Sequence, residues 1–582
     1  MLQRALLLAF LAGIPVGAQS LPPETDRLVS TGRLWITVKY FHPYLAYRDL
    51  DWDQALVDAL PKIRAAGTMA EYEAAVRSMM HCLEDSVSPA GTAGQRMWIH
   101  RGLPPEIGEP SGDFYSAFLY KPGSVIDEVN VPMGGFSVKV RLSEPATSAG
   151  IPAPRPARIY SDAYPSTELR ILAAYKIWGV FHYFFAYRDL MDEDWDALLA
   201  QFLPRLIAAK DALEYNLSIT EWVTHSADSL AVVEGETISH YFGEAPVGLR
   251  LRLIEKHVAI TEVLDSDAVH AGVKAGDVVK KVDGELLIDR FKRLAQYVGA
   301  STLQRLAVDV TARILNGPEG SSASLTLEDY AGNRKEVTLK RGKRFTDLVG
   351  AEGPGEAVKL LRGGIGYADL RRLKRNQVDA MFETFRHAPA IVFDMRGVPA
   401  DDSITVIAPR LTKEPDVPAA IVTGPIAVAP DLQRGSIANP SSSYFFLETI
   451  GNSEQWKYLG KTLMLVDERT IGAGEQAGLF LEAANKTEFI GSPTGGANSV
   501  LTNFTLPGGI AISLSGQDIR HVNGGKLQRL GLQPNVSVAP TLTGVRTGKD
   551  EVLEKALDYL LPKSPKAMPS KPKDISRPLI GL

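Results

Sequence analysis

The sequence predicts a multidomain α/β protein with two repeated helical modules, a small β-domain and a C-terminal α/β domain. Three observations predict this fold class. The chain has 582 residues, which is too many for one hydrophobic core. An aromatic-rich helical stretch recurs 143 positions later, and the C-terminal part alternates strand-like with helix-like segments. The composition, 45% hydrophobic and 23% charged, is that of an ordinary globular protein.

The N-terminus predicts a signal peptide. The stretch MLQRALLLAFLAGIPVGAQS has one basic residue, Arg4, an apolar run too short to span a bilayer, and Val16-Gly17-Ala18 as a small-residue cleavage site. We therefore expect residues 1–18 to be removed and the mature chain to be periplasmic or secreted. No later apolar run reaches the ~20 residues of a transmembrane helix, so stable membrane insertion is not expected.

The first helical module is predicted at 26–90 and the second at 166–240. The stretch LWITVKYFHPYLAYRDLDWDQAL recurs as IWGVFHYFFAYRDLMDEDWDALL, and both have aromatic residues at helical spacings of three and four. Four landmarks share the offset of 143: Trp35 and Trp178, Trp52 and Trp195, Glu71-Tyr72 and Glu214-Tyr215, and Asp85-Ser86 and Asp228-Ser229. We interpret the aromatic residues as core, with a ligand pocket as the alternative.

Residues 91–160 separate the two modules. They contain Gly, Pro and alternating segments such as GFSVKVRLS, which predict strands and loops without indicating a function. Cys82 precedes them as the only cysteine, so an internal disulfide and Cys-based metal sites are excluded; we interpret it as a small buried apolar residue. The formal net charge is -5 with dispersed Lys and Arg, so no nucleic-acid partner is expected.

The small β-domain is predicted at 243–342. Its most specific segment, AGVKAGDVVKKVDGE, has Gly-Asp and Asp-Gly pairs where tight turns need them. The segment resembles a PDZ domain of the bacterial protease-associated kind. That resemblance implies that Gly248, Leu249, Arg250 and Leu251 offer backbone N–H groups to the terminal carboxylate of a peptide, which adds as a strand to the sheet edge.

The C-terminal α/β domain is predicted at 356–562, followed by a disordered Pro- and Lys-rich tail at 563–582. Its strands and helices alternate through GGIGYADL, AIVFDMRG, TLMLVDE, a helix at Ala473 to Asn485, EFIGSP and GIAISLSG. Between strand TLMLV and that helix lies a sharp turn of the kind with which hydrolases present a nucleophile at a helix N-terminus. Here the turn carries Gly472 and Gly474, which have no reactive group.

The ordered motifs FDMRG, VDERT, GSPTGGAN and GLQPNV resemble those of the tail-specific, or C-terminal processing, serine peptidases, and of their tricorn-like branch most closely. The resemblance covers about 166–545. It implies a crotonase/ClpP-like α/β peptidase domain. It also implies a serine nucleophile in a Thr-x-Ser-x-x-Glu frame, where this chain has Gly472, so acyl-enzyme chemistry cannot begin there.

The resemblance implies further site positions, and these are substituted too. The lysine that one branch uses as base falls on Ala497, and the histidine of the tricorn-like Asp-Ser-His motif falls on Leu230. A glutamate of the same branch aligns with Gln528. The family's Arg-Gly-Asn-x-Gly-Gly loop, which helps to form the oxyanion hole, reads RGVPAD here. Gly397 and the Ala473 N–H remain as donors to that oxyanion hole.

No other constellation of catalytic residues is evident. Ser492, Thr494, Ser499, His387 and His521 lie in the same domain without a spacing that pairs them. The histidine best placed to replace the missing base is His225, one helical turn before Asp228-Ser229 in the second module. HExxH, Walker A and dinucleotide motifs are absent from the sequence, so no metal, ATP or NAD cofactor is expected.

Three functions remain open. The favoured hypothesis is an exported, peptidase-like protein that binds peptide or unfolded-protein C-termini without cutting them. The first alternative is an active serine-type endopeptidase with a non-standard nucleophile. The second is a carrier of small apolar ligands, which only the aromatic-rich repeats support. The sequence does not predict an oligomeric state.

Overall fold

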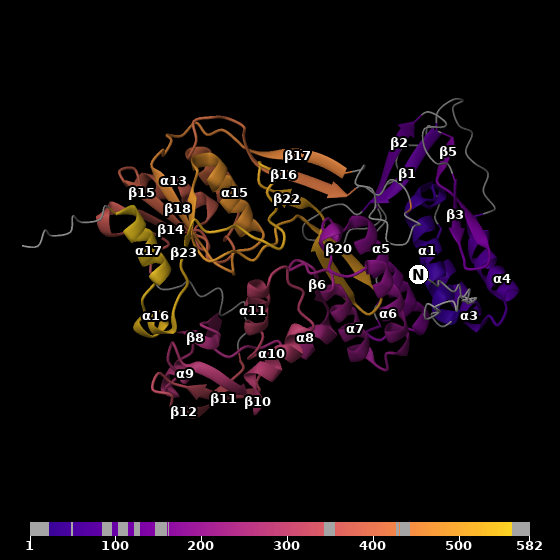
Figure 1. Cartoon of the computed structure of the whole chain (residues 1–582), viewed down its shortest axis with the longest axis horizontal. Helices are drawn as coiled ribbons and strands as arrows, with labels where there is room; N and C mark the ends of the chain where they lie inside the picture. The colour runs from indigo at the N-terminus through magenta and orange to yellow at the C-terminus, as the bar shows by residue number, and fades with distance from the viewer. Residues whose placement is uncertain are drawn as a thin grey trace, which may run out of the picture.

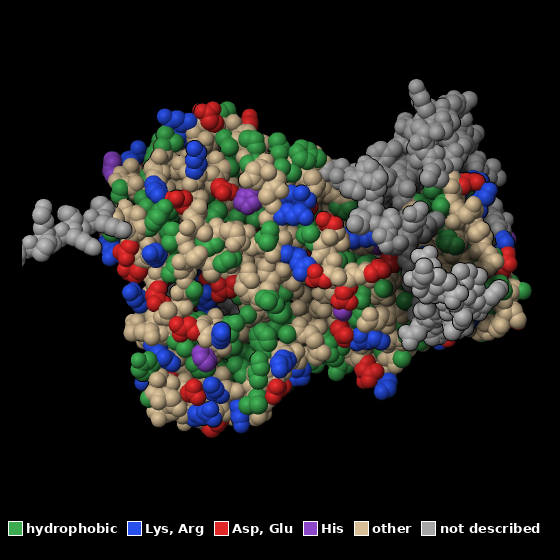
Figure 2. Space-filling model, in the orientation of Figure 1, with side chains coloured by type: hydrophobic (Ala, Val, Ile, Leu, Met, Phe, Trp, Pro, Cys, Tyr) green, Lys and Arg blue, Asp and Glu red, His purple; other side chains and the backbone are tan. Residues whose placement is uncertain are grey.

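The computed structural model describes residues 23–47, 50–83, 96–102, 114–120, 128–145, 160, 162–342, 355–425, 430 and 443–561. Figure 1 shows the helical modules in indigo to purple, the small domain in magenta and the C-terminal domain in orange to yellow. The predicted signal peptide and tail lie outside the described residues. None of the helices in these ranges is long and apolar enough to cross a bilayer. On the face shown in Figure 2, basic and acidic side chains of the described residues are interspersed.

Each helical module consists of three main helices. The first module has α1 (Pro23–Phe41), α3 (Trp52–Ala65) and α4 (Met69–Met80), and the second has α5 (Thr167–Phe184), α6 (Trp195–Ala208) and α7 (Ala212–Thr224). Helices α3 and α6 begin and end 143 positions apart, and each has an aspartate as its N-cap. The short helices are α2 (Tyr44–Tyr47), η1 (His81–Leu83), η2 (Arg188–Leu190) and α8 (Glu236–Phe242).

Equivalent hydrogen bonds hold the two modules together internally. Arg27 Nε donates to the carbonyl of Ile63 at 3.2 Å, and Arg170 Nε donates to the carbonyl of Leu206 at 2.9 Å. Both donors and both acceptors are 143 positions apart. These two hydrogen bonds therefore recur at the spacing of the sequence repeat.

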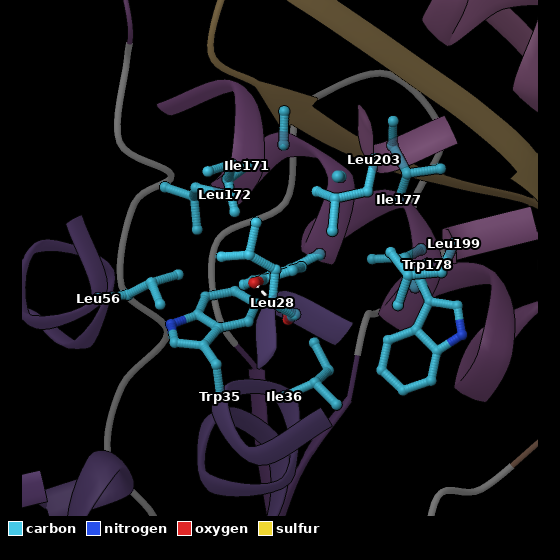
Figure 3. Packing of buried hydrophobic residues seen from close by; sticks show 14 of the residues in the cluster. Leu28, Trp35, Ile36, Leu56, Ile171, Leu172, Ile177, Trp178, Leu199 and Leu203 are labelled. Atoms are coloured by element: carbon cyan, nitrogen blue, oxygen red, sulfur yellow. Dashed lines mark hydrogen bonds between the residues drawn. The ribbon is translucent and has the colours of Figure 1, made fainter. Parts of the chain in front are cut away.

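The aromatic residues of the repeats are buried in one core that both modules share. Trp35 and Trp178 are fully buried, and Phe202 stacks on Trp222 with ring centroids 5.4 Å apart. Figure 3 shows side chains of the first module, including Leu28 and Trp35, packed against those of the second. This packing agrees with the core interpretation. Cys82, predicted to be buried, is half-buried against the same core.

The segment between the modules forms strands, as expected. These are β1 (Arg96–Gly102), β2 (Phe114–Tyr120), β3 (Glu128–Pro132), β4 (Ser137–Arg141) and β5 (Ser143–Pro145). One sheet has the order β2-β1-β5, and β3 pairs with β4 as a separate hairpin. Val131 and Val140 of that hairpin are buried in the core of the helical modules.

The small domain is a sheet of order β12-β11-β9-β8-β7, in which β10 also pairs with β9. Its strands are β7 (Leu249–Ile254), β8 (His257–Val263), β9 (Val278–Val282), β10 (Glu285–Leu286), β11 (Ser322–Glu328) and β12 (Arg334–Lys340). Its helices are α9 (Ser266–His270), α10 (Leu287–Ala295) and α11 (Leu303–Thr311). Strand β7 is an edge strand with α11 beside it.

The C-terminal domain is built on a sheet of order β13-β14-β15-β18-β19-β23, parallel except for β13. The strands are β13 (Val358–Leu360), β14 (Gly366–Asp369), β15 (Ala390–Asp394), β18 (Lys461–Val466), β19 (Glu488–Gly491) and β23 (Val536–Ser537). Helices α13 (Val378–Thr384) and α15 (Ala473–Asn485) pack on one face, and α17 (Glu551–Leu560) packs on the other. Burial on both faces explains the continuous apolar runs of these strands.

Two smaller sheets lie beside this central sheet, and one of them includes a strand of the second helical module. One has the order β17-β16-β22, formed by β16 (Val417–Pro425), β17 (Ser443–Ile450) and β22 (Asp518–Arg520). The other has the order β20-β21-β6, formed by β20 (Leu501–Leu506), β21 (Ile510–Ser515) and β6 (Val232–Glu234). The predicted GIAISLSG strand is thus β21, which pairs with the second helical module and lies outside the central sheet. The remaining elements are η3 (Arg362–Gly364), η4 (Arg375–Gln377), α14 (Ile404–Ile407), η5 (Ala408–Arg410) and α16 (Leu542–Thr547).

Candidate active site

The strand-turn-helix at the centre of the domain joins β18 to α15. Gly472 is the N-cap of α15 and has φ +54° and ψ -118°, a conformation that costs residues with a side chain about 1–3 kcal/mol. A Cβ built on Gly472 would have no other atom within 4 Å. The turn therefore has open space for a side chain at the position where this chain has none.

Glu475, in the first turn of α15, holds the neighbouring loop in place. Its carboxylate accepts hydrogen bonds from the Thr494 hydroxyl, from the Gly496 N–H at 2.8 Å and from the Ala497 N–H at 3.0 Å. Complete burial raises the pKa of Glu475 to about 7, although these three donors act in the opposite direction. The carboxylate thus determines where the loop from Thr494 to Ala497 lies relative to the turn.

The two positions that the resemblance assigns to the nucleophile and the lysine base are in direct contact. The Gly472 N–H donates to the Ala497 carbonyl at 2.8 Å. Ala497 is fully buried. The resemblance assigned both positions to one catalytic site, and in the fold the two residues are hydrogen-bonded neighbours.

The second helical module brings its Asp-Ser pair to the same region. Asp228 is fully buried, which raises the pKa of its carboxyl, and it accepts from the N–H groups of Leu230 at 3.1 Å and Ser515 at 3.0 Å. The Gln528 amide donates to Asp228 at 3.3 Å, and the next residue, Arg529, donates its N–H to the Gly496 carbonyl at 2.8 Å. Leu230 and Gln528 are therefore joined to the Glu475 loop through consecutive hydrogen bonds.

The two expected oxyanion donors differ in their environment. Ala473 is exposed and is the first residue of α15, where helix N–H groups have no intrahelical acceptor. The Gly397 N–H instead donates to the Met395 carbonyl at 2.7 Å. Donation from Gly397 to a bound oxyanion would therefore require this hydrogen bond to break.

The hydroxyls near the turn have other partners. Ser492 donates to Glu468 at 3.0 Å, Thr494 donates to Glu475, and Ser499 donates to the Gln517 carbonyl at 2.7 Å. Among the described residues, none of these hydroxyls is hydrogen-bonded to a histidine.

The histidines also lie in other surroundings. His225 contacts Glu193 at 2.6 Å and packs edge-on against Phe202. His521 contacts Glu482 at 2.9 Å, and His387 is exposed. His225 therefore lies close to Asp228 in sequence, three residues before it, but its imidazole contacts Glu193.

A cavity of about 530 Å³ lies between β7 and α11 and reaches the turn. On the small domain it is lined by Leu249, Arg250, Leu251, Ala307 and Val308, among others, and on the C-terminal domain by Gly397, Ile471 and Ser492. Gly248, one of the four residues predicted to bind a peptide carboxylate, packs against Asp265, and its carbonyl accepts a hydrogen bond from the Leu264 N–H at 2.8 Å.

An ion-pair cluster that the sequence analysis missed joins the small domain to the turn. Arg252 of β7 donates to Asp467 at 3.1 Å and to Glu468 at 2.6 Å, directly after β18. From α11's N-cap, the Thr302 hydroxyl donates to the Gly495 carbonyl at 2.9 Å. The carboxylates belong to the quoted VDERT motif, but the sequence contains no signal that pairs them with an arginine 215 positions earlier. In the described part of the chain no cluster of His, Cys, Asp and Glu suits a metal ion.

Comparison with known proteins supports the architecture. Over 302 residues, the chain is 22% identical to a probable CtpA-like serine protease of Staphylococcus haemolyticus, covering 50% of this chain and about half, 52%, of that protein's length. The solved structure of mature CPAF complexed with lactacystin is similar in fold, with a TM-score of 0.51, 11% identity, and coverage of 68% of this chain and 99% of that one. A CPAF mutant gives a TM-score of 0.53 at 12% identity, over 67% and 96% of the two chains.

A family comparison covers the sheet and the turn described above. Residues 364–538 match the family model described as Peptidase family S41. This range includes β14 to β23, Gly472, Glu475, Ala497 and Gln528. The chain therefore contains, over residues 364–538, a domain of peptidase family S41, the family of the tail-specific proteases.

Proposed function

We propose that this protein is an exported member of the tail-specific peptidase family that binds peptide or protein C-termini and has lost proteolysis. The observation that carries the proposal is Gly472, whose turn keeps the strained backbone and the open space of a nucleophile site without a nucleophile. Glycine has no oxygen or sulfur to attack a carbonyl, so no covalent intermediate can form there. The Leu230 and Ala497 side chains, at the two base positions, cannot accept a proton.

The binding half of the proposal depends on the cavity between β7 and α11. We assign the small domain, residues 243–342, to the PDZ type because an edge strand and a neighbouring helix enclose this cavity, as a peptide adding to a sheet edge requires. Leu249, Leu251 and Val308 offer apolar contacts, and Arg250, which pairs with Glu262 at 3.5 Å, lies beside them. A peptide C-terminus, with an apolar side chain and a carboxylate, fits this chemistry.

Hydrolysis measurements test the loss of proteolysis. We expect the purified chain to leave an unfolded protein and C-terminally labelled peptides intact. The double variant Gly472→Ser, Leu230→His should hydrolyse them, and Gly472→Ala, Leu230→His should not. Cleavage by the natural chain that survives repurification and is unaffected by Gly472→Ala would contradict the proposal.

A peptide panel tests the binding. We expect saturable binding of peptides with a free carboxylate and at least about tenfold weaker binding of the same peptides with an amidated C-terminus, since a charged hydrogen-bonded partner is lost. Equal affinity for both forms would refute capture of C-termini.

One observation favours an alternative nucleophile. Ser492 lines the same cavity, and its hydroxyl donates to Glu468. Glu468 is itself paired with Arg252 at 2.6 Å. Labelling by a fluorophosphonate probe that is lost in Ser492→Ala would support this alternative; a chain that never labels would exclude it. The carrier hypothesis loses its support because the repeat aromatics form core contacts.

Export remains part of the proposal and rests on the predicted signal peptide, residues 1–18. Mass spectrometry of the N-terminus of the chain from producing cells tests it. We expect a mature chain that begins just after Ala18, in the periplasm or medium. An intact N-terminus on protein recovered from the cytoplasm would contradict export.

A further inference from the structure

The two helical modules contact each other through equivalent positions. Gly32 and Tyr175 are 143 positions apart, and a Cβ on Gly32 would lie 2.6 Å from the Tyr175 ring. Ile36 and Gly179 are also 143 apart, and a Cβ on Gly179 would lie 2.3 Å from Ile36 Cδ1. Each glycine of one module thus accommodates the large side chain at the same position of the other.

The ion pairs across this interface occur in the same reciprocal way. Arg33 of the first module contacts Asp196 of the second at 3.4 Å. Lys176 of the second module contacts Asp53 of the first at 3.9 Å. The two cations are 143 positions apart, as are the two carboxylates, so the second pair is the first with the modules exchanged.

Aromatic contacts at the ends of α1 and α5 repeat the pattern. The ring centroids of Tyr40 and Phe184 are 5.1 Å apart, and those of Phe41 and Tyr183 are 5.3 Å apart. Exchanging the modules converts one of these contacts into the other. Tyr40 and Tyr183, which are equivalent, contact each other at 5.8 Å. Figure 3 shows the surrounding aliphatic residues of both modules meeting between these helices.

Reciprocal contacts of this kind define a two-fold interface, in which residue i contacts j and j contacts i. We infer that α5 and α6 present a dimerisation face. The partner that fits this face is a second helical module of the same fold, and residues 23–83 supply it within the chain. The first module therefore occupies the place that a second subunit would take in a dimer. The face that it covers is not available to a further protein.

The glycines make the two halves specific for each other. Pairing two copies of the second module would place Tyr175 against Tyr175 and Gly179 against Gly179, giving a clash at one level and a void at the other. In the first module these two positions hold Gly32 and Ile36, so its packing against the second module avoids both the clash and the void. The face thus selects the first module over a second chain.

An exchange of residues across the axis tests the inference in the full-length chain. Gly32→Tyr alone introduces the clash, and Tyr175→Gly alone leaves a cavity and removes the hydrogen bond from the Tyr175 hydroxyl to the Leu28 carbonyl. We expect each single variant to lower Tm by at least about 4 °C. If the interface is two-fold, the double variant places the tyrosine and the glycine in equivalent surroundings and recovers at least half of the summed loss.

A matched control and a second readout complete the experiment. Gly32→Tyr combined with Tyr183→Gly changes the same residue types at non-equivalent positions and should show no recovery. If Gly32→Tyr alone is insoluble, the soluble yield of the exchange variant replaces Tm. Additive losses in the exchange variant, or its insolubility when Tyr175→Gly alone is soluble, would overturn the inference.

Discussion

The N–H of Gly472 donates to the carbonyl of Ala497 at 2.8 Å, so two residues 25 positions apart in sequence, which the resemblance assigns to the nucleophile and the lysine base, are hydrogen-bonded neighbours. Ala497 is in turn held by Glu475 through its own N–H. Both contacts use main-chain groups at positions 472 and 497, which any residue provides. The geometry of the turn is therefore maintained independently of the side chains that catalysis would need.

Gly472→Ala tests the strain in the turn. The φ of +54° disfavours any side chain, while the surrounding space is open, so we expect a loss of about 1–3 kcal/mol in the free energy of unfolding. Urea unfolding measures it. Gly451→Ala, in open space without a positive φ, is the control and should be neutral or slightly stabilising. Equal effects of the two substitutions would show that the turn is relaxed.

Glu475→Gln tests the buried carboxyl. A folded-state pKa of about 7 lies above the ordinary value of about 4.3, so the proton-linked stability is complete below pH 4.3 and is lost as pH rises through about 7, by roughly 3 kcal/mol. We expect the Tm of the parent chain to fall between pH 5 and pH 8 by several degrees more than that of the variant. Glu454→Gln, at an exposed position of the same domain, should retain the parent's dependence. A parallel fall in all three proteins would contradict the prediction.

Arg252→Ala tests the ion-pair contact between the small domain and the turn. Burial opposes ionisation of Asp467, but the charges of Arg469 and Arg252 hold its pKa at about 2. This lowered pKa gives stability that is present above about pH 3.9 and lost as pH falls through about 2. Without Arg252, we expect acid unfolding to begin at higher pH, and stability at pH 7 to fall by about 1–3 kcal/mol. Arg334→Ala, an exposed pair with Glu328, should change neither, whereas matching acid transitions in both variants would refute the role of Arg252.

Val308→Glu tests the cavity as a binding groove. Val308 is half-buried on α11 and lines the cavity, so a carboxylate there repels a peptide C-terminus and removes apolar contact. Affinity for a free-carboxylate peptide, measured by fluorescence anisotropy, should fall at least about tenfold with little change in Tm. Ile288→Glu, exposed on another surface of the same domain, should bind like the parent chain. Unchanged affinity of Val308→Glu would exclude this groove.

Local sequence patterns predicted the helices and strands better than they predicted which strands pair with each other. The helix from Ala473 to Asn485 is found with the predicted bounds, because a glycine-bearing turn and an amphipathic run mark its start. GIAISLSG was predicted to be a strand and is one, but its pairing with β6, about 280 positions earlier, depends on tertiary contacts that periodicity does not encode.

The candidate site shows the same difference between local residues and their contacts. Motif frames located Gly472, Ala497, Leu230 and Gln528, and hydrogen bonds join these segments in the fold. The role of Glu475 as acceptor for the 494–497 loop was not predicted, because its donors are backbone groups that any sequence provides. The Gly248 contact with Asp265 was missed because the resemblance fixes a loop's position and not its packing.

The position of β7 at the sheet edge has a consequence for selectivity. Main-chain N–H and C=O groups are nearly the same in every polypeptide, so an edge strand distinguishes a guest by its direction and extended shape more than by its side chains. Preference for residue type would come from side chains of α11 and from the residues of β7 and the C-terminal domain that line the same cavity. The proposed peptide groove would therefore bind peptides of varied sequence with moderate affinity and release each of them readily.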